Sequence, residues 1–418
     1  MKFSMPIWLS MAALCGTSTA FAQTWFQTSA PITNWVSIAS SADGTKLAAA
    51  VSLGGIWTST NSGNSWLETG APRSAWLRLV SSADGTRLAA IGEPTLMPGP
   101  PFTYTGSFYS STNSGTTWNS NNLPSLPKFG ANSYGLASSA DGRRLAAWVS
   151  SSPASTLFTS TNSGSTWITN TLPSGAWDTA AFSADGTRLL VGGSGILVST
   201  NSGSSWMLTN TFPASCVSLS ADGAKGVAVS KQLIGQLVYT STNSGTTWTP
   251  TSAPATNWIA LASSADGCQL VVVAGGKLVL LDQAVTGPIY TSTNSGATWK
   301  SNNVPVHNWT CVTASADGCK LVAADTGILS SNVPGATVGG GIWTAHISPT
   351  PSLKITPTNG NFRLSWIVPS TDFVLEQSTG LAGWSEAAST PALNLTNLQD
   401  EATLSPIGNS GFYRLKTP

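Results

Sequence analysis

The chain has 418 residues, of which 8% are charged, and its formal net charge at pH 7 is +1. A chain with so few charges and no basic excess lacks the electrostatic attraction that drives binding to nucleic acid or to an anionic membrane surface. We therefore expect neither of them as a partner.

Residues 1–22 predict a signal peptide. A basic start at Lys2 is followed by the apolar run MPIWLSMAALC, and Ala20-Phe21-Ala22 supplies the small residues of a cleavage site. No later segment is long and apolar enough to span a bilayer. We expect a secreted protein, extracellular or periplasmic, after cleavage near Ala22.

The string STNSGxxW occurs six times and predicts a tight turn between two strands in each copy. In the first copy Asn61 can bond the backbone two residues on, Gly63 supplies a positive φ, and Trp66 covers the turn. Aromatic and β-branched residues flank the turns, which favours strands over helices. The copies begin at Ser59, Ser111, Ser160, Ser199, Ser241 and Ser292.

A second string, SADG or its equivalent, alternates with the first and occurs seven times. It lies between alternating stretches such as WVSIASS and TKLAAAV, so it predicts a hairpin with Gly in the left-handed position. The repeating unit then has four strands: A before SADG, B after it, C before STNSG and D after that turn. The aspartates are Asp43, Asp84, Asp141, Asp185, Asp222, Asp266 and Asp317.

The spacing of these aspartates, 37 to 57 residues, is close to the roughly 40 to 50 residues of a four-stranded propeller blade. Seven units predict an all-β, seven-bladed β-propeller in residues 23–347. Blade 7 stops after its third strand, GGGIWTAH, whereas the mature N-terminus, QTWFQTSAP, resembles a lone fourth strand. We predict that residues 24–28 supply the outer strand of blade 7 and close the ring.

The sequence changes character after a proline-containing linker near residues 348–352. Segments such as NFRLSWIV, DFVLEQST, ALNLTNL and GFYRLK predict short strands in the remaining residues. They suffice for a small β-sandwich, which we place in residues 348–418.

The string STNSGxxW is similar to the Asp-box, SxDxGxxW, of sialidase-like (BNR) repeat β-propellers. All six copies carry Asn where the family has Asp, which keeps the acceptor of the turn without its charge. The resemblance extends over roughly residues 24–346 and implies the propeller fold. It implies no single function, because Asp-boxes occur in sialidases, xyloglucanases, sorting receptors and photosystem assembly factors.

The C-terminal part resembles modules of secreted proteins from bacteria of the Verrucomicrobia and Planctomycetes type. The resemblance rests on the FYRL string, Phe412 to Leu415. An adhesive or anchoring role is a hypothesis that follows from its position in the chain.

The mature chain holds four cysteines, at two positions of the repeat. Cys216 and Cys311 lie six residues before an SADG aspartate, and Cys268 and Cys319 lie two residues after one. Since blades 6 and 7 are neighbours, a Cys268–Cys319 disulfide is the pairing to test first. The alternative is that all four are small residues filling small sites.

In a propeller the A–B and C–D turns share one face, and the D–A and B–C loops form the other. The second face varies most here, with B–C insertions at residues 92–107, around Asp282, and at residues 331–340. We expect a ligand to bind there, over the central channel. Strand A begins with Trp in five blades, and these indoles could stack on a ligand or pack between blades: Trp35, Trp76, Trp177, Trp258 and Trp309.

Residues that break the repeat are further candidates for ligand binding. Asp178 and Arg78 put charges into strand A where the other blades carry uncharged residues. The alternative is a local ion pair or simple exposure at the channel mouth. Arg73 and His307, in D–A loops of the same face, complete the set.

Catalysis finds little support in these residues. A sialidase needs three converging arginines, but only Arg73 and Arg78 lie on the loop face. A different glycosidase needs two carboxyl groups about 5–10 Å apart, and no spacing marks such a pair. The two histidines and the scattered cysteines show no metal-ligand spacing, and no cofactor motif is present. The acids that could reach the loop face are Glu93, Asp178, Asp282 and Asp325.

Our leading hypothesis is a secreted, non-catalytic propeller, expected to be a monomer without metal or cofactor. It would bind a glycan or an extracellular protein through its D–A/B–C loop face. The alternative is a carbohydrate-active hydrolase or lyase that uses some of the four acids. A structural or assembly role is the third possibility.

Overall fold

The computed structural model describes residues 24–418 apart from short segments, and its regular elements are all β-strands. The predicted signal peptide, residues 1–22, lies outside the described residues. In the part that the structure describes, no helix is long and apolar enough to cross a membrane. The segments outside the description are 98–102, 124–130, 152–154, 233–234, 276–286, 303, 305–306, 330–336, 339, 347–352, 359–360, 368–373, 381–382, 388, 406–410 and 417–418.

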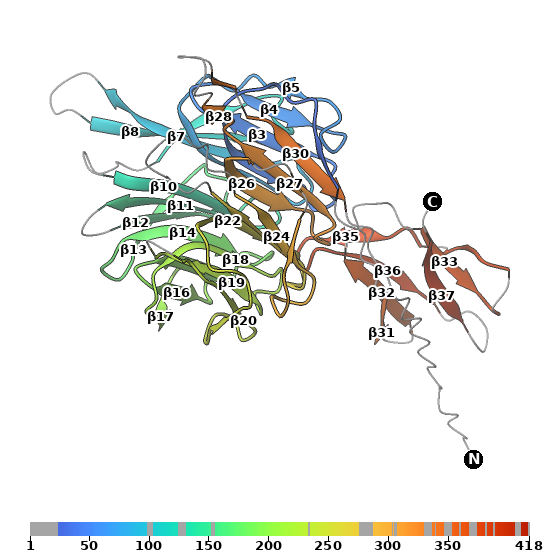
Figure 1. The fold of residues 1–418 in the computed structure, drawn as a ribbon. Coiled ribbons are helices and arrows are strands. Elements are labelled where there is room, and N and C mark those ends of the chain that lie inside the picture. The colour runs from blue at the N-terminus through green and yellow to red at the C-terminus, as the bar shows by residue number, and fades with distance from the viewer. Residues whose placement is uncertain are drawn as a thin grey trace.

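Seven four-stranded antiparallel sheets form the blades of a β-propeller (Figure 1), which confirms the predicted fold class. Blade 1 comprises β2 (Trp35–Ser40), β3 (Leu47–Val51), β4 (Ile56–Ser59) and β5 (Leu67–Glu68); blade 2 comprises β6 (Trp76–Ser81), β7 (Leu88–Met97), β8 (Thr103–Ser111) and β9 (Asn119–Asn122); blade 3 comprises β10 (Ala131–Ser138), β11 (Leu145–Ser151), β12 (Thr156–Ser160) and β13 (Ile168–Thr171). Blade 4 comprises β14 (Trp177–Phe182), β15 (Leu189–Gly193), β16 (Ile196–Ser199) and β17 (Met207–Asn210); blade 5 comprises β18 (Ala214–Leu219), β19 (Gly226–Ser230), β20 (Val238–Ser241) and β21 (Thr249–Pro250); blade 6 comprises β22 (Trp258–Ser263), β23 (Leu270–Ala274), β24 (Ile289–Ser292) and β25 (Lys300–Ser301).

Blade 7 is closed by the N-terminal strand, as predicted. It comprises β26 (Trp309–Ala314), β27 (Lys320–Asp325), β30 (Ile342–His346) and β1 (Trp25–Gln27), and the short hairpin of β28 (Ile328–Leu329) and β29 (Thr337–Val338) lies between β27 and β30. Strand β1 pairs antiparallel with β30, with Trp25 opposite Ala345 and Gln27 opposite Trp343. The two ends of the propeller sequence are thereby joined by backbone hydrogen bonds.

The inner strands of each blade follow one sequence logic. The B strands of blades 1 and 6, LAAAV in β3 and LVVVA in β23, are buried at every position because each lies inside its sheet and both its faces pack against other blades. The A strands carry a β-bulge near their start in all seven blades. A bulge leaves one residue unpaired and redirects its side chain.

The STNSG turns use Asn in a different way from the one predicted. Asn61 Oδ1 accepts from the backbone amide of Ser65, four residues on rather than two, at 2.8 Å, and its Nδ2 donates to Ser65 Oγ at 2.9 Å. Ser62, at φ 57°, shares the left-handed region with Gly63. The indole of Trp66 donates to the carbonyl of Gly63 at 3.1 Å and covers the turn as expected.

The alanines of the seven SADG turns form a closed ring. The amide of each donates to the carbonyl of the alanine in the next blade, from Ala42 to Ala83 and onward until Ala316 returns to Ala42, with N···O distances of 2.6–2.9 Å. No blade can leave this ring without breaking two of these bonds. The ring therefore fixes the width of the channel at the SADG end.

The C-terminal module consists of two sheets, in agreement with the predicted sandwich. One sheet holds β31 (Lys354–Thr358), β32 (Asn361–Ile367), β36 (Gln399–Leu404) and β35 (Ala392–Asn394), and the other holds β34 (Ser385–Glu386), β33 (Val374–Ser378) and β37 (Phe412–Lys416). The core contains Leu364, Trp366 and Leu375.

The FYRL string has a structural role in this module. Arg414 forms an ion pair with Glu376 at 2.6 Å, and its guanidinium lies 4.3 Å from the ring centroid of Trp384. Lys416 contacts the same carboxylate at 3.4 Å. The string thus fixes β37 against β33 and the loop before β34.

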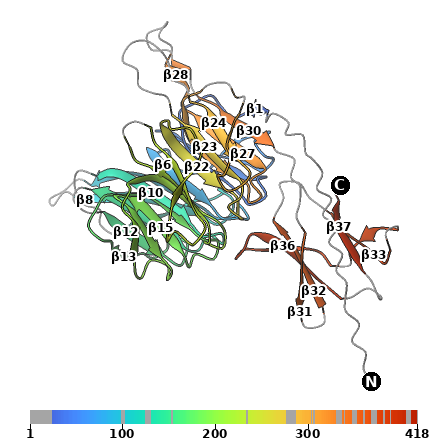
Figure 2. The same ribbon diagram turned by 60° about the horizontal axis from the view of Figure 1, so that its bottom comes forward.

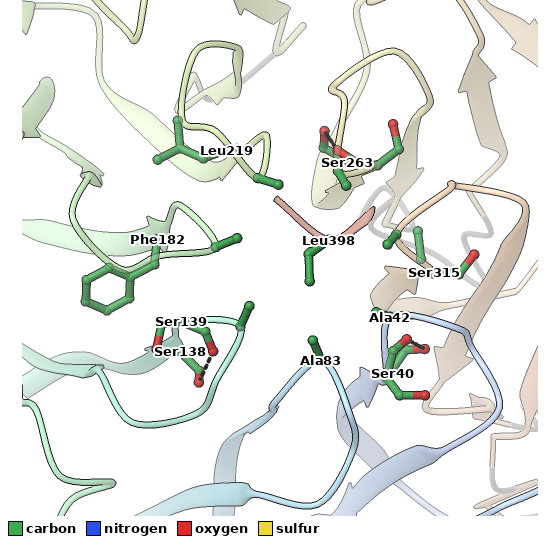
Figure 3. A pocket seen from close by; sticks show the side chains of 18 of the residues that line it. Ser40, Ala42, Ala83, Ser138, Ser139, Phe182, Leu219, Ser263, Ser315 and Leu398 are labelled. Atoms are coloured by element: carbon green, nitrogen blue, oxygen red, sulfur yellow. Dashed lines mark hydrogen bonds between the residues drawn. The ribbon is translucent and has the colours of Figure 1, made fainter. Parts of the chain in front are cut away.

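The C-terminal module packs against the SADG end of the propeller, a contact that the sequence did not predict. Ile367, Leu393, Leu395 and Leu398 lie against the alanine ring. Leu398, at φ 55°, points toward the middle of the ring, where the side chains of Ala42 and Ala83 surround it (Figure 3). A cavity of about 190 Å³ remains at this end of the channel, lined by residues of all seven blades and by Leu398.

Candidate functional site

The two faces of the propeller are built as the sequence predicts. Hydrogen bonds join each STNSG turn to an SADG turn, as from the amide of Ser62 to the carbonyl of Thr45 at 2.8 Å. On the opposite face, B–C loops bridge to D–A loops, with Gly54 paired to Ser74 and Gly287 paired to His307. The long β7–β8 hairpin and the β28–β29 hairpin extend away from the C-terminal module (Figures 1 and 2). The described residues of the module therefore cover the SADG face and not the loop face.

The five tryptophans that begin A strands are buried, with exposed fractions of 0–2%. The indole of Trp76 donates to the carbonyl of Gly54 at 3.0 Å, and that of Trp309 donates to the carbonyl of Gly287 at 2.9 Å. Of the two alternatives for these tryptophans, stacking on a ligand and packing between blades, their burial fits packing between blades. No indole face is available for stacking on a ligand, so we leave the five residues out of the proposed binding surface: Trp35, Trp76, Trp177, Trp258 and Trp309.

Asp178 occupies the bulge of β14 and forms an ion pair with Lys231, which directly follows the B strand of blade 5. The carboxylate is only 14% exposed, whereas the Lys231 side chain is 54% exposed. A local ion pair is therefore the alternative that fits Asp178. The sequence did not reveal Lys231 as its partner, because the contact joins two blades.

Arg78 projects into the channel. Its guanidinium donates to the carbonyl of Leu77 at 2.9 Å, and its charge acts on the thiols of Cys216 in blade 5 and Cys311 in blade 7, which lie across the ring from blade 2. Burial raises the pKa of Cys311 to about 11, and the nearby guanidinium offsets part of that rise. Arg78 thus places a positive charge among buried, neutral thiols.

His307 and Asp325 are brought together at the start of blade 7. Nδ1 of His307 lies 3.5 Å from Oδ2 of Asp325, and the imidazole ring centroid lies 5.2 Å from that of Trp309 and 4.7 Å from that of Trp343. The buried carboxylate also accepts from the indole of Trp343 at 3.1 Å and from the amide of Gly327 at 2.7 Å. Asp325 therefore ties the B–C loop of blade 7 to its D–A loop.

Glu93 and Tyr134 lie near each other between blades 2 and 3. Burial raises the pKa of Tyr134, and the carboxylate of Glu93 adds to that rise. Asp282 falls outside the described residues. Within the described part of the chain, no group of three or more His, Cys, Asp and Glu side chains is arranged to hold a metal ion.

Arg73 belongs to an exposed patch of the loop face. Its side chain is 72% exposed and pairs with Glu68 at 3.1 Å. The neighbouring B–C loop of blade 1 carries Leu53, and the D–A loop before that blade carries Ile32; these side chains are 77% and 63% exposed. The amide of Ser52 donates to the carbonyl of Asn34 at 2.9 Å and joins the two loops. Neither apolar residue was a candidate from the sequence alone, because neither lies in an STNSGxxW or an SADG string.

All four described cysteines are free, so the Cys268–Cys319 disulfide is not formed. Cys319 Sγ faces the carbonyl of Asp317 at 3.7 Å, within its own turn. Cys268 Sγ lies 3.1 Å from Nζ of Lys225 in the preceding blade. Each sulfur is thus turned to a partner other than the second thiol.

The comparisons with solved structures agree on the fold. The NkGH74 enzyme of Niastella koreensis matches with a TM-score of 0.57 at 14% identity, and the GH74 xyloglucanase of Xanthomonas campestris matches with 0.54 at 15%. Each match covers 82% of this chain and 59% of the other, so the chain spans about three-fifths of the length of these two proteins. YCF48 from Cyanidioschyzon merolae matches with a TM-score of 0.53 at 13% identity, over 77% of this chain and 98% of its own. A structure of YCF48 bound to D1 peptide matches with 0.50 at 14% identity, over 80% of this chain and 97% of its own.

At identities this low, the similarity shows a β-propeller and nothing about activity. No protein-family model and no curated protein sequence matches the chain. The candidate site therefore has to be judged from its own residues.

Proposed function

We propose that this protein is a secreted, non-catalytic binding propeller that takes a glycan or an extracellular protein on its D–A/B–C loop face. The observation that carries the proposal is the position of the C-terminal module, whose Leu398 occupies the alanine ring at the opposite end of the channel. Of the two ends of the channel, the loop-face end is the one that the described residues of the module do not cover. Loops held by a rigid scaffold are the usual place for binding residues.

The exposed patch on blade 1 supports a binding role for this face. Leu53 is a bulky residue at φ 56° with most of its surface in solvent. A leucine in the left-handed region costs about 1–2 kcal/mol, and strain of this kind collects at binding sites. Ile32 and Arg73 lie in the adjoining loops, so the patch combines apolar surface with a charged rim.

The acids on the loop face support binding rather than catalysis. Asp178 is paired with Lys231, Asp325 is buried among hydrogen-bond donors, and Glu93 lies beside Tyr134. An acid and a base for glycoside cleavage would need one carboxyl group free to donate a proton and a second one poised over the substrate. Of the three described acids, Asp178 and Asp325 are thus committed elsewhere, which leaves the exposed Glu93 without a second free carboxylate among them.

The similar structures fit a binding role without deciding the ligand. One of them is a xyloglucanase, and another is a propeller with a bound peptide. We infer secretion from the predicted signal peptide, and a monomer without metal or cofactor from the sequence. A carbohydrate-active hydrolase or lyase stays the second candidate, because the fold is shared with such enzymes.

The test is a panel of polysaccharides and extracellular proteins, scored for both retention and cleavage. Leu53→Asp should abolish retention, whereas Leu67→Asp, a matched change of an exposed leucine on the outer strand β5, should not. Release of products that Asp178→Asn abolishes would overturn the proposal in favour of the enzyme. Retention that survives Leu53→Asp would move the binding surface elsewhere on the propeller.

A further inference from the structure

Arg78 stands at a position where the other blades hold small residues. Ser37, its equivalent in blade 1, bonds the amide of Leu79 in blade 2 at 3.0 Å, and Cys216 in blade 5 bonds the carbonyl of Ile259 in blade 6 at 3.1 Å. The short side chains at this position are therefore just long enough to contact the A strand of the next blade. A side chain as long as arginine extends past that strand and into the channel.

Among the residues that the structure describes, the charge of Arg78 has no acidic partner. Its one hydrogen bond goes to the backbone carbonyl of Leu77, and no carboxylate among the described residues forms an ion pair with it. Asp178, in the A strand of blade 4, is already paired with Lys231. A guanidinium inside a channel and without a counter-charge is a ready site for an anion.

In the part of the chain that the structure describes, the SADG end of the channel is covered. Leu398 lies in the alanine ring at the SADG end, so a chain could not thread through. A group that reaches Arg78 must enter from the loop face and must be a chain end or a side group. A carboxylate meets this condition, because it is small and matches the two-pronged geometry of a guanidinium.

The rest of the channel wall favours a hydroxylated carrier for that carboxylate. Strand A is the inner edge of every blade, so its outward backbone amides and carbonyls have no strand partner. Side chains of the preceding blade take some of them, such as the amide of Leu79 and the carbonyl of Ile259, and the others can face a ligand. A sugar hydroxyl can accept a hydrogen bond from a backbone amide and can donate one to a backbone carbonyl, so it suits both kinds of group. Except for Arg78, the ring of equivalent positions is uncharged.

We propose that Arg78 binds the carboxylate of a uronic acid residue, so that the ligand of this propeller is an acidic glycan. The inference rests on the proposed function in one respect, the entry of the ligand from the loop face. It adds the chemical class of the ligand and the residue that selects it.

The test is calorimetric titration of the full mature chain with two uronates, D-glucuronate and trigalacturonate. D-glucose serves as a neutral sugar for comparison, and N-acetylglycine serves as a carboxylate that resembles a peptide end. Arg78→Ser installs the residue that blade 1 already carries, so the blade should fold, and a thermal melt checks this. Arg143→Ser, an exposed arginine of an SADG turn on the other face, is the matched control. We expect uronate affinity to fall at least about tenfold in Arg78→Ser and to stay unchanged in Arg143→Ser.

Each alternative result has its own meaning. Binding of neutral glycans only, or uronate binding unaffected by Arg78→Ser, would overturn the inference while the proposed function stands. N-acetylglycine binding as well as glucuronate would assign the site to a peptide carboxylate and overturn the glycan class. If the wild-type chain bound no glycan and no protein at all, the proposed function itself would be wrong.

Discussion

The indole of Trp25 packs against that of Trp309, with ring centroids 6.3 Å apart and planes inclined by 45°. Trp25 belongs to β1, at the beginning of the propeller sequence. Trp309 belongs to β26, the A strand of blade 7. Trp25 is 6% exposed and belongs to the same hydrophobic cluster as Val273 and Leu321. The closing strand is therefore held by core packing as well as by its backbone hydrogen bonds.

The first prediction concerns this closure. Trp25→Ala should lower the free energy of unfolding by about 3–5 kcal/mol, since it removes a buried indole. A chain that begins at Ser29 should lose at least as much, because it also loses the pairing with β30. Urea unfolding followed by tryptophan fluorescence measures both. Equal stability of the shortened and the full mature chain would contradict the closure.

The second prediction concerns the docking of the C-terminal module. Leu398→Asp should detach the module from the propeller, because a carboxylate inside a ring of alanines would be buried without a partner. Small-angle X-ray scattering should then show a larger radius of gyration. Ile355→Asp, on an exposed position of the module, is the control and should leave the radius unchanged. An unchanged radius in Leu398→Asp would mean that Leu398 does not hold the module in place.

The third prediction separates two acids that the sequence grouped together. Asp325→Ala leaves the amide of Gly327 and the indole of Trp343 without their shared acceptor, so it should cost about 1–3 kcal/mol for each of these donors. Asp178→Ala breaks a pair whose lysine is half exposed and should cost less than about 1 kcal/mol. The comparison of their urea midpoints checks the order. If both variants lost the same free energy of unfolding, the burial of Asp325 would not determine how much it contributes to stability.

The sequence was sufficient for features that the blades repeat. Each blade solves the same packing problem with the same strings, so the turns, the four strands and the missing fourth strand of blade 7 could be read from their spacing. The bulge near the start of strand A follows from no such string. It determines which way Asp178 points, and the pairing with Lys231 arises only once blades 4 and 5 are adjacent.

Contacts between distant units could not be predicted for the same physical reason. Leu398 lies in the stretch ALNLTNL, whose alternation predicts a strand and says nothing of what its end touches. Its position depends on how the module docks on the alanine ring. The buried state of Trp76 likewise depends on the neighbouring B–C loop, whose Gly54 carbonyl accepts its indole proton. Repetition in the sequence marked these tryptophans, but only the assembled blades decide between a stacking surface and a core.

The last prediction concerns acid stability and the SADG turns. Burial acts to raise the pKa of Asp43, but hydrogen bonds from Ser41 and Thr45 outweigh it and hold the pKa below its ordinary value of 3.8. The pKa values of Asp84 and Asp185 are lowered in the same way, by the serine and threonine of their own turns. A carboxyl group whose pKa is lowered by folding stabilises the protein above its unfolded pKa, and that contribution is lost as the pH falls through the folded value.

Burial lowers the pKa of His346 below its ordinary value of 6.5, so stability should decline slightly as the pH falls from 7 through this range. The aspartates add a second, steep decline below about pH 4. Thermal melts across this range measure the decline. Asp43→Asn removes one of the titrating groups and should make the acid decline shallower, at the cost of lower stability at pH 7. Asn61→Asp, in a neighbouring STNSG turn, is the converse variant, because it adds a carboxylate that accepts from the amide of Ser65. It should steepen the decline, and the same slope in all three chains would show that these turns do not control acid stability.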